Sequence, residues 1–239
     1  MYINELVIEV TRRCNLACQH CLRGDPQDVD ISNETIDKAL KYVTEIGTIT
    51  FTGGEPSLAV DRIRYIYDQI KARNINLYGF YVVTNGKIAS RELMNVLIDL
   101  YILIGCPDNE DYNAGLAISK DQYHEQEVYD DERKAAEKLY KALSFYRPED
   151  KSARIEYLIN EGRAFGMGNR DVSLETLIVE TDEKGKPERV EGTIYINALG
   201  DVITSCDMSF ESQDENKIGN VRKTSLSRIV AKAVADIKA

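Results

Sequence analysis

Short runs of β-branched residues alternate with amphipathic segments over about the first 170 residues of this chain. Five runs predict strands, at residues 5–10, 48–52, 78–84, 116–119 and 154–159. Between them apolar residues recur at helical spacing, most clearly at residues 131–146, and Ser32 and Ser90 stand at N-cap positions. Five or six such units favour a parallel α/β sheet in an incomplete barrel. We therefore predict an incomplete (β/α)6 TIM-like barrel over residues 1–172.

From residue 173 onward the chain departs from this alternation. Two β-rich runs flank a turn at residues 183–188 that contains Gly and Pro, which is typical of a β-hairpin. Ser225 can then cap a last helix with one apolar face. We therefore predict that residues 173–239 form a small extension, a β-hairpin plus a helix, that closes the open side of the barrel.

Three of the five cysteines, Cys14, Cys18 and Cys21, are spaced C-x3-C-x2-C directly after the first predicted strand. An odd number of cysteines without a signal peptide argues against a disulfide framework and favours a bound metal. A structural zinc ion takes four protein ligands, and no C-x2-C or H-x3-H pair downstream completes such a set. Three thiolates can instead hold a cubane iron–sulfur cluster and leave one iron open to a non-protein ligand.

Charge and hydropathy exclude several classes of protein. No run approaches the ~18 apolar residues of a membrane-spanning helix. The N-terminus also lacks the basic and apolar regions of a signal peptide. We therefore expect a cytoplasmic protein without a membrane partner. The chain has 40 acidic and 30 basic residues, and its net charge of −10 disfavours electrostatic binding of nucleic acid.

Polar residues and glycines follow the C-terminal ends of the predicted strands, where the active sites of parallel barrels lie. They are Gly53, Gly54 and Glu55 after the second strand, Thr84 and Asn85 after the third, Ser119 and Asp121 after the fourth, and Asn160 and Arg163 after the fifth. Each group also has an ordinary structural interpretation. Glycine permits tight turns, Asn-Gly tolerates left-handed angles, serine or aspartate can cap a helix, and arginine is commonly exposed.

The cysteine spacing, together with the sequence GGEP at residues 53–56, resembles the radical S-adenosylmethionine (radical SAM) superfamily. The resemblance implies an oxygen-sensitive enzyme with a [4Fe–4S] cluster on the three cysteines. In that family the open iron chelates S-adenosylmethionine, which the reduced cluster cleaves to a 5′-deoxyadenosyl radical that abstracts a substrate hydrogen. The implied cofactor contacts are Gly53, Gly54 and Glu55 at the methionyl amino group, Thr84 and Asn85 at the third strand end, Ser119 and Asp121 at the ribose, Asn160 and Arg163 near the adenine and the carboxylate, and His20 beside the adenosyl group.

The tail sequence also resembles the C-terminal extension of SPASM and twitch radical SAM proteins, which usually carries auxiliary iron–sulfur clusters. Only Cys206 is left of the cysteines of that extension, so we expect no auxiliary cluster. The resemblance favours a peptide or protein substrate. Within the superfamily, the alternatives are a glycyl-radical activase and an enzyme acting on a nucleotide or other small molecule. From a different class, the alternative is a non-catalytic iron–sulfur sensor of redox state.

Three further residues are candidates for catalysis. His124 follows the fourth strand and could face the substrate. Cys106 or Cys206 could supply a hydrogen atom or bind substrate, although a small buried hydrophobe is the simpler interpretation of each.

Arginines surround the three cysteines, at Arg12, Arg13 and Arg23. They predict either a basic rim that receives an acidic flavodoxin or ferredoxin as electron donor, or positive charge that stabilises the cluster itself.

Overall fold

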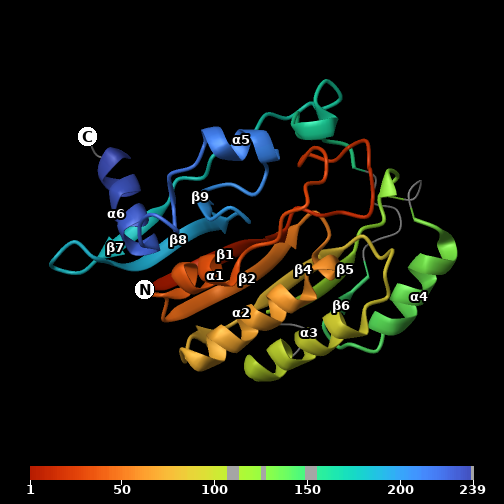
Figure 1. Ribbon diagram of the computed structural model, residues 1–239, viewed down its shortest axis with the longest axis horizontal. Helices are drawn as coiled ribbons and strands as arrows, with labels where there is room; N and C mark the ends of the chain where they lie inside the picture. Colours follow the sequence, from red (N-terminus) through yellow and green to blue (C-terminus); the bar gives the residue numbers. More distant parts are fainter. Residues whose placement is uncertain (107–112, 125–127, 149–154, 238–239) are drawn as a thin grey trace.

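The computed structural model describes residues 1–106, 113–124, 128–148 and 155–237. Within these residues ten strands form one sheet. The strands are β1 (Tyr2–Thr11), β2 (Glu45–Gly53), β3 (Asn76–Leu77), β4 (Phe80–Thr84), β5 (Ala114–Ile118), β6 (Tyr146–Arg147), β7 (Ile178–Thr181), β8 (Pro187–Ile196), β9 (Asp201–Ile203) and β10 (Gly219–Asn220). Their order is β10-β9-β8-β1-β2-β4-β5-β6, with β3 paired to β2 and β7 paired to β8. The two ends of this order do not pair, so the sheet is open (Figure 1).

Helices connect the strands and cover the sheet (Figure 1). They are α1 (Asn33–Leu40), α2 (Val60–Ala72), α3 (Arg91–Leu103), α4 (Asp130–Tyr140), α5 (Phe210–Glu215) and α6 (Leu226–Ile237), with two 3-10 turns, η1 (Pro56–Leu58) and η4 (Gly162–Ala164). The predicted caps are confirmed, because the Ser32 hydroxyl accepts the Thr35 N–H. The Ser90 hydroxyl likewise accepts the Leu93 N–H. No helix in the described ranges is long and apolar enough to span a membrane.

Six neighbouring strands, β8, β1, β2, β4, β5 and β6, run parallel to one another. Alternate residues of β1 face opposite sides of the sheet. Leu6, Ile8 and Val10 are completely buried in the main core, which also includes the apolar faces of α1, α2 and α3. Val7 faces the other side and packs against Tyr195 of β8. This arrangement confirms the predicted α/β class with an incomplete, open barrel.

The structure corrects the predicted end of one helix. The helix expected over residues 131–146 is α4, which ends at Tyr140, and residues 146–147 form β6 beside β5. The apolar residues that suggested a longer helix pack against the sheet instead. Phe145 is buried against the ring of Phe80, with the ring centroids 5.3 Å apart. Packing against the sheet therefore overrides the helical spacing.

The strand expected over residues 154–159 is also corrected. Residue 154 lies outside the described residues, residues 155–158 have no regular secondary structure, and Ile159 makes a single bridge to Arg170. The side-chain amide of Gln122 forms the two backbone hydrogen bonds that a neighbouring strand would form with Ile155. It donates to Ile155 O at 2.9 Å and accepts the Ile155 N–H at 3.0 Å.

The C-terminal segment continues the sheet beyond β1. β7 and β8 form the predicted antiparallel hairpin, and β8 pairs in parallel with β1, with Tyr195 opposite Val7. Residues 194–196 are completely buried, which suits a strand inside a sheet better than one at its edge. The segment therefore extends the sheet from β1, on the side away from β6. That it closes the open side of the barrel stays a prediction. The boundary at residue 172 stays a prediction.

Candidate active site

The three cysteines of the C-x3-C-x2-C segment lie in the long loop between β1 and α1, at the carboxyl end of the sheet. All three line one cavity of about 270 Å³, together with residues that follow β2, β4 and β5. Leu16 and Val128 pack with the buried Cys18 at this cavity. Burial raises the pKa of the Cys14 thiol to about 11. Such a thiol keeps its proton at neutral pH unless a metal ion replaces it.

Two glycines bring the end of β2 against the backbone that leads into the cysteine loop. The Gly54 N–H donates to Thr11 O at 2.9 Å, and the next N–H, of Glu55, donates to Arg13 O at 2.8 Å. A Cβ atom on Gly53 would overlap Thr11 O, and one on Gly54 would overlap the Arg13 carbonyl. Gly53 also has a φ of 146°. Glycine alone fits this close approach, so the GG pair couples β2 to the cysteine loop.

Glu55 ties the end of β2 to the end of β4. Its side chain is buried, and Oε1 accepts the Thr84 hydroxyl at 2.6 Å and the Ser57 N–H at 3.0 Å. Oε2 accepts the Asn85 N–H at 2.8 Å. A carboxylate oxygen can accept two hydrogen bonds, so Oε2 keeps room for one donor from the cavity that Glu55 lines.

Asn85 links the end of β4 to the cysteine loop. Its Nδ2 donates to Asn15 Oδ1 at 2.8 Å, and its Oδ1 accepts the Lys87 N–H at 2.9 Å. Thr84 and Asn85 both line the cavity, but these side-chain hydrogen bonds go to the protein itself. They hold the cavity wall in place.

Two histidines meet beside Asp121, which follows β5. His124 Nδ1 lies 2.6 Å from Asp121 Oδ2. His20 Nε2 lies 3.8 Å from Asp121 Oδ1, and the His20 ring stacks on Tyr123 with centroids 4.5 Å apart. The two histidine rings meet edge to face at 4.9 Å. Nδ1 of His20 is buried and has no hydrogen-bond partner among the described residues.

These contacts move the pKa values of the two histidines in opposite directions. Burial lowers the pKa of His20. Burial also acts to lower the pKa of His124, but hydrogen bonds with Asp121 and Cys18 outweigh it and raise that pKa to about 9. The pKa of Asp121 is lowered because the contact with His124 outweighs its burial. At neutral pH the carboxylate of Asp121 therefore lies beside an imidazolium, that of His124.

Ser119 and Arg163 also line the cavity, whereas Asn160 and Asp121 are not among its lining residues. Arg163 Nε donates to Cys18 O at 3.0 Å, and the backbone N–H of the same arginine donates to Cys21 O at 2.9 Å. Asn160 instead accepts a backbone N–H within the loop around η4. Arg163 therefore clamps the cysteine loop, while Asn160 shapes the segment that carries the arginine.

Comparison with known families agrees with this geometry. A family model described as the radical SAM superfamily matches residues 8–111, the segment that carries the cysteine loop, Glu55 and the end of β4. This segment, 8–111, thus carries a radical SAM domain. Such a domain indicates an enzyme.

The curated relatives match over part of their length. An uncharacterized protein of Methanocaldococcus jannaschii is 29% identical over 107 residues, which are 43% of this chain and 37% of that protein. A GTP 3′,8-cyclase of Clostridium acetobutylicum is 37% identical over 90 residues, which are 35% of this chain and 28% of that protein. The alignments thus span about a third of each relative.

A solved structure has the same fold over nearly the whole chain. It is native anSMEcpe with bound AdoMet and the Cp18Cys peptide. The TM-score is 0.59 at 12% sequence identity, and the match covers 96% of this chain and 80% of that chain. At this identity the likeness shows the fold.

The residues present fit the [4Fe–4S] cluster and the S-adenosylmethionine that the radical SAM superfamily uses. The three thiols supply soft ligands in one cavity, and no fourth cysteine is among the described residues that line it. An iron would therefore stay open. The remaining acceptor site on Glu55 Oε2 and the unpartnered Nδ1 of His20 provide polar atoms for a bound molecule.

The sequence analysis missed a buried network beneath the cysteine loop. Glu9 is completely buried, and its Oε1 accepts Arg12 Nε at 2.7 Å. Its Oε2 accepts the Tyr195 hydroxyl at 2.6 Å. Arg12 Nη2 also donates to Gln213 Oε1 of α5 at 2.7 Å. The signal that could have found this network is a glutamate inside the otherwise apolar run at residues 6–10, where a buried charge requires partners.

Of the three arginines beside the cysteines, Arg12 is buried, whereas Arg13 and Arg23 are half-buried. Arg12 is 3% exposed, and Arg13 makes two hydrogen bonds of 2.8 Å to the Asp30 carboxylate. Arg23 donates to Met208 O at 2.6 Å. The hydrogen bonds of all three guanidinium groups hold the cysteine loop to its surroundings. That an acidic flavodoxin or ferredoxin donates the electron stays a prediction.

Of the three candidate catalytic residues, only His124 lines the cavity. Cys106 is exposed after the end of α3. Cys206 is partly buried against the cluster of Val7 and Tyr195. Burial raises the pKa of Cys206 to about 12, so its thiol is protonated at neutral pH.

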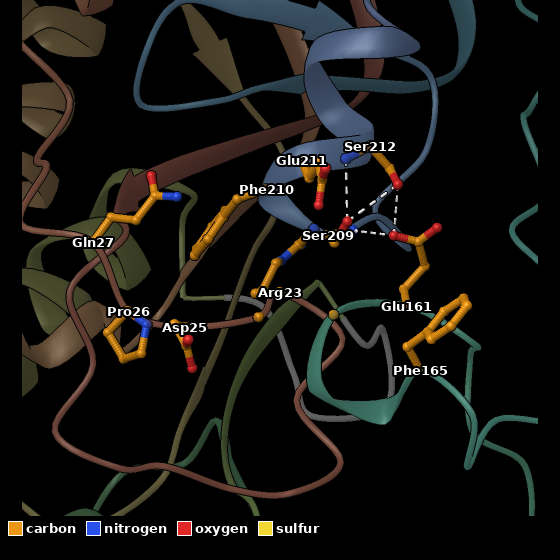
Figure 2. A pocket seen from close by; sticks show the side chains of 12 residues that line it. Arg23, Asp25, Pro26, Gln27, Glu161, Phe165, Ser209, Phe210, Glu211 and Ser212 are labelled. Atoms are coloured by element: carbon orange, nitrogen blue, oxygen red, sulfur yellow. Dashed lines mark hydrogen bonds between the residues drawn. The ribbon is translucent and has the colours of Figure 1, made fainter.

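A second hollow lies beside the cysteine loop (Figure 2). It has a volume of about 440 Å³ and is bounded by residues 23–27, residues 161–165 and the start of α5. Arg23 lines both this hollow and the cavity of the cysteines. Phe165 is 75% exposed at its edge. The two spaces are therefore neighbours.

The second hollow is acidic. Glu161 Oε2 accepts the Ser209 N–H at 3.0 Å and the Ser212 hydroxyl at 2.7 Å. These hydrogen bonds outweigh burial and lower the pKa of Glu161, which keeps its carboxylate charged. Asp25 and Glu211, both exposed, add two more carboxylates to the lining, although Asp25 Oδ1 lies 3.3 Å from Arg163 Nη1 and Arg23 adds one guanidinium group (Figure 2).

Proposed function

We propose that this chain holds a [4Fe–4S] cluster on Cys14, Cys18 and Cys21 and uses it to cleave S-adenosylmethionine reductively. The observation that carries the proposal is that the three cysteines, Glu55 and the ends of β4 and β5 line one cavity of about 270 Å³. When bound, the reduced cluster supplies the electron for this cleavage, and the resulting 5′-deoxyadenosyl radical abstracts a hydrogen from the substrate.

The chain's own residues bind and orient the cofactor in this proposal. Glu55 Oε2 offers its remaining acceptor site to the ammonium of the methionyl group. The His20 ring, stacked on Tyr123, offers a flat surface to the adenosyl group. Asp121 is a weaker candidate for the ribose than the sequence predicted, because its carboxylate already holds His124. Asn160 is likewise a weaker candidate, because its side chain serves its own loop.

A peptide or protein is the substrate that the second hollow favours. Its carboxylates, at Asp25, Glu161 and Glu211, complement cationic side chains, and Phe165 offers an exposed aromatic surface. The hollow also adjoins the proposed site of radical formation, because Arg23 lines both spaces. The solved anSMEcpe structure of similar fold holds a peptide, which agrees with this choice.

A nucleotide is the second candidate substrate, because one relative is named GTP 3′,8-cyclase. The acidic hollow disfavours this candidate, since its carboxylates repel a triphosphate. Mass spectrometry of the reaction products, described below, distinguishes a peptide substrate from a nucleotide.

The cofactor proposal is tested with the full chain reconstituted anaerobically with iron and sulfide. We expect the reduced protein to convert S-adenosylmethionine to 5′-deoxyadenosine and methionine, measured by liquid chromatography and mass spectrometry. A variant with all three cysteines changed to alanine serves as the control and should form neither product. A cluster-loaded, reduced wild type that neither binds nor cleaves S-adenosylmethionine would favour the redox sensor instead.

The substrate class is tested by untargeted mass spectrometry of anaerobic cell extracts incubated with the active enzyme. We expect an unsaturated, crosslinked or epimerised peptide. Glu211→Lys, which reverses one charge in the acidic hollow, should lower the yield of that peptide several-fold while 5′-deoxyadenosine formation persists. Glu183→Lys, an exposed charge reversal in the turn between β7 and β8, is the matched control. Products confined to nucleotides would contradict a peptide substrate.

A further inference from the structure

A hollow lies at the end of the sheet opposite the cofactor cavity, which the three loop cysteines line. This amino-end hollow has a volume of about 430 Å³ and is bounded by Tyr42 after α1, by Lys186 before β8 and by residues 223–228 at the start of α6. α6 lies at the end of the sheet where β1 begins (Figure 1). β2 begins shortly after Tyr42 and ends at Gly53, which lines the cofactor cavity. Since β2 has nine residues and a strand rises about 3.3 Å per residue, roughly 30 Å separate the two spaces.

The lining of the amino-end hollow is basic, although the whole chain has a net charge of −10. It includes Lys186, Lys223 and Arg228, and none of the described residues that line it is acidic. The side chains of these three residues form no ion pair and donate no hydrogen bond within the described part of the chain. An adjoining hollow adds three more basic residues, Lys38, Lys41 and Arg222, of which Lys38 pairs with Glu34. Because like charges repel, an anion bound between them stabilises this arrangement.

Ser227 contributes a buried hydroxyl to the same lining. The residue is 8% exposed, and its hydroxyl has no hydrogen-bond partner among the described residues. A serine inside a helix often donates its hydroxyl hydrogen to a backbone carbonyl one turn earlier, and Ser227 does not do so. A buried hydroxyl without a partner is unfavourable, because it has lost its hydrogen bonds to water. An oxygen of a molecule bound in the hollow would accept this hydrogen bond.

The first turn of α6 adds backbone donors next to Ser227. The sequence predicts that the Ser225 hydroxyl caps this helix, but within the described residues it accepts no N–H group. The N–H groups of Leu226 and Ser227 therefore have no acceptor in the described part of the chain. α6 has 12 residues, so the helix dipole adds partial positive charge at this end. Backbone N–H groups, a buried hydroxyl and three cationic side chains thus meet at one place.

We propose that the amino-end hollow binds a phosphoryl group, as free phosphate or as the phosphate of a small phosphomonoester. A phosphoryl group carries up to two negative charges and three acceptor oxygens, and it can therefore use all of these donors. A carboxylate has one charge and two oxygens, which suit a single arginine better. The volume of about 430 Å³ also leaves room for an organic group beside the phosphate. The inference goes beyond the proposed function and needs neither the cluster nor S-adenosylmethionine.

A ligand in the amino-end hollow is too far from the cofactor cavity to be the substrate of the radical chemistry. It would instead join three segments that are distant in sequence, since the hollow is lined from the end of α1, the start of β8 and the start of α6. A ligand that binds only the folded chain raises the free energy of unfolding. The site therefore links the stability of this end of the sheet to the phosphate concentration.

The test measures binding of inorganic phosphate to the full chain by isothermal titration calorimetry, at an ionic strength held constant with chloride. We expect Arg228→Gln and Lys223→Gln each to raise the Kd about tenfold, because each removes a charge-assisted hydrogen bond. Ser227→Ala should raise the Kd about threefold, because it removes one uncharged hydrogen bond. Lys232→Gln removes an exposed positive charge from α6 outside the hollow, and this matched control should leave the Kd unchanged.

Glucose 6-phosphate, with glucose as its control, identifies the source of the phosphoryl group. Tighter binding of glucose 6-phosphate than of inorganic phosphate supports a phosphomonoester, and tighter binding of inorganic phosphate supports the free anion. Glucose that binds as tightly as glucose 6-phosphate overturns the inference, and so does a folded wild type that binds neither phosphate probe at millimolar concentration.

The variants give two further outcomes that overturn the inference. One is a Kd that stays at the wild-type value in both Arg228→Gln and Lys223→Gln. The other is an equal rise of the Kd in Lys232→Gln and Arg228→Gln, because the effect would then come from the overall charge. Cleavage of S-adenosylmethionine is measured separately, and its absence refutes the proposed function without affecting this inference.

Discussion

Thr84 donates its hydroxyl hydrogen to Glu55 Oε1 across 2.6 Å, and this bond joins the ends of β4 and β2 beneath the cofactor cavity. Glu55 is 1% exposed, and with the N–H groups of Ser57 and Asn85 its carboxylate receives three donors. The residue thus has a structural role in addition to the expected contact with the cofactor. A buried acceptor surrounded by donors tolerates no substitution that removes its acceptor capacity.

Glu55→Gln is expected to lower the free energy of unfolding by about 1.5–3 kcal/mol, because its NH2 group would face N–H and O–H donors. It should also weaken binding of S-adenosylmethionine to the cluster-loaded protein. Urea denaturation measures the first effect, and anaerobic equilibrium dialysis measures the second. Glu183→Gln, in the exposed turn between β7 and β8, is the matched control and should change neither. Equal free energies of unfolding for the two variants would contradict the structural role of Glu55.

The three loop cysteines are expected to bind one [4Fe–4S] cluster per chain on anaerobic reconstitution. Changing Cys14, Cys18 and Cys21 together to alanine should abolish the cluster, because no other cysteine lines the cavity among the described residues. Iron and sulfide analysis with absorption spectroscopy makes the measurement. Cys106→Ala controls for loss of a thiol elsewhere. Full cluster content in the triple variant would refute the assignment.

The sequence was sufficient to predict those parts of the site that depend on neighbouring residues. The cysteine spacing requires one loop to present three ligands, and Gly53 and Gly54 fit a backbone approach that any side chain would block. The serine caps and the long strands were predictable for the same reason, since caps and period-2 patterns are local.

Contacts between distant parts of the chain could not be predicted from the sequence. Arg12 and Gln213 are 201 residues apart in sequence, and their bond exists only because β8 and α5 pack beside β1. The same packing buries Arg12, one of the three arginines of the expected basic rim, in an internal network. β6 was missed because two residues give too little pattern to distinguish a strand from the end of a helix.

Asp30→Asn is expected to lower the free energy of unfolding by up to about 1 kcal/mol at pH 7, a value that allows for solvent screening of this partly exposed pair. Burial would raise the pKa of Asp30, but hydrogen bonds from Arg13 and Thr11 outweigh it and lower the pKa below 3.8. A lowered carboxyl pKa stabilises the folded state above the unfolded value, and the contribution is lost as the pH falls through the folded value.

The difference between wild type and Asp30→Asn should therefore shrink between pH 5 and pH 3, values on either side of the ordinary carboxyl pKa of about 3.9. Urea denaturation at both pH values measures it. Asp28→Asn, at an exposed position of the same loop, controls for the loss of one negative charge. A difference that stays constant over this range would show that the Asp30 carboxylate does not act through its charge.

The two remaining cysteines are expected to hold no auxiliary cluster, because Cys106 is exposed after the end of α3 and Cys206 is partly buried on the face of the sheet that carries Val7. Cys106 follows α3, which packs in the core that contains Ile8, whereas Cys206 packs against Val7 and Tyr195 on the other face. Two thiols so placed cannot share one cubane within a chain, and each alone falls short of the usual four ligands. The variant with both cysteines changed to alanine should therefore keep the wild-type iron and sulfide content and its cleavage of S-adenosylmethionine. A wild-type iron content near twice that of one cubane, halved in this variant while cleavage survives, would show instead that the C-terminal segment carries a second cluster.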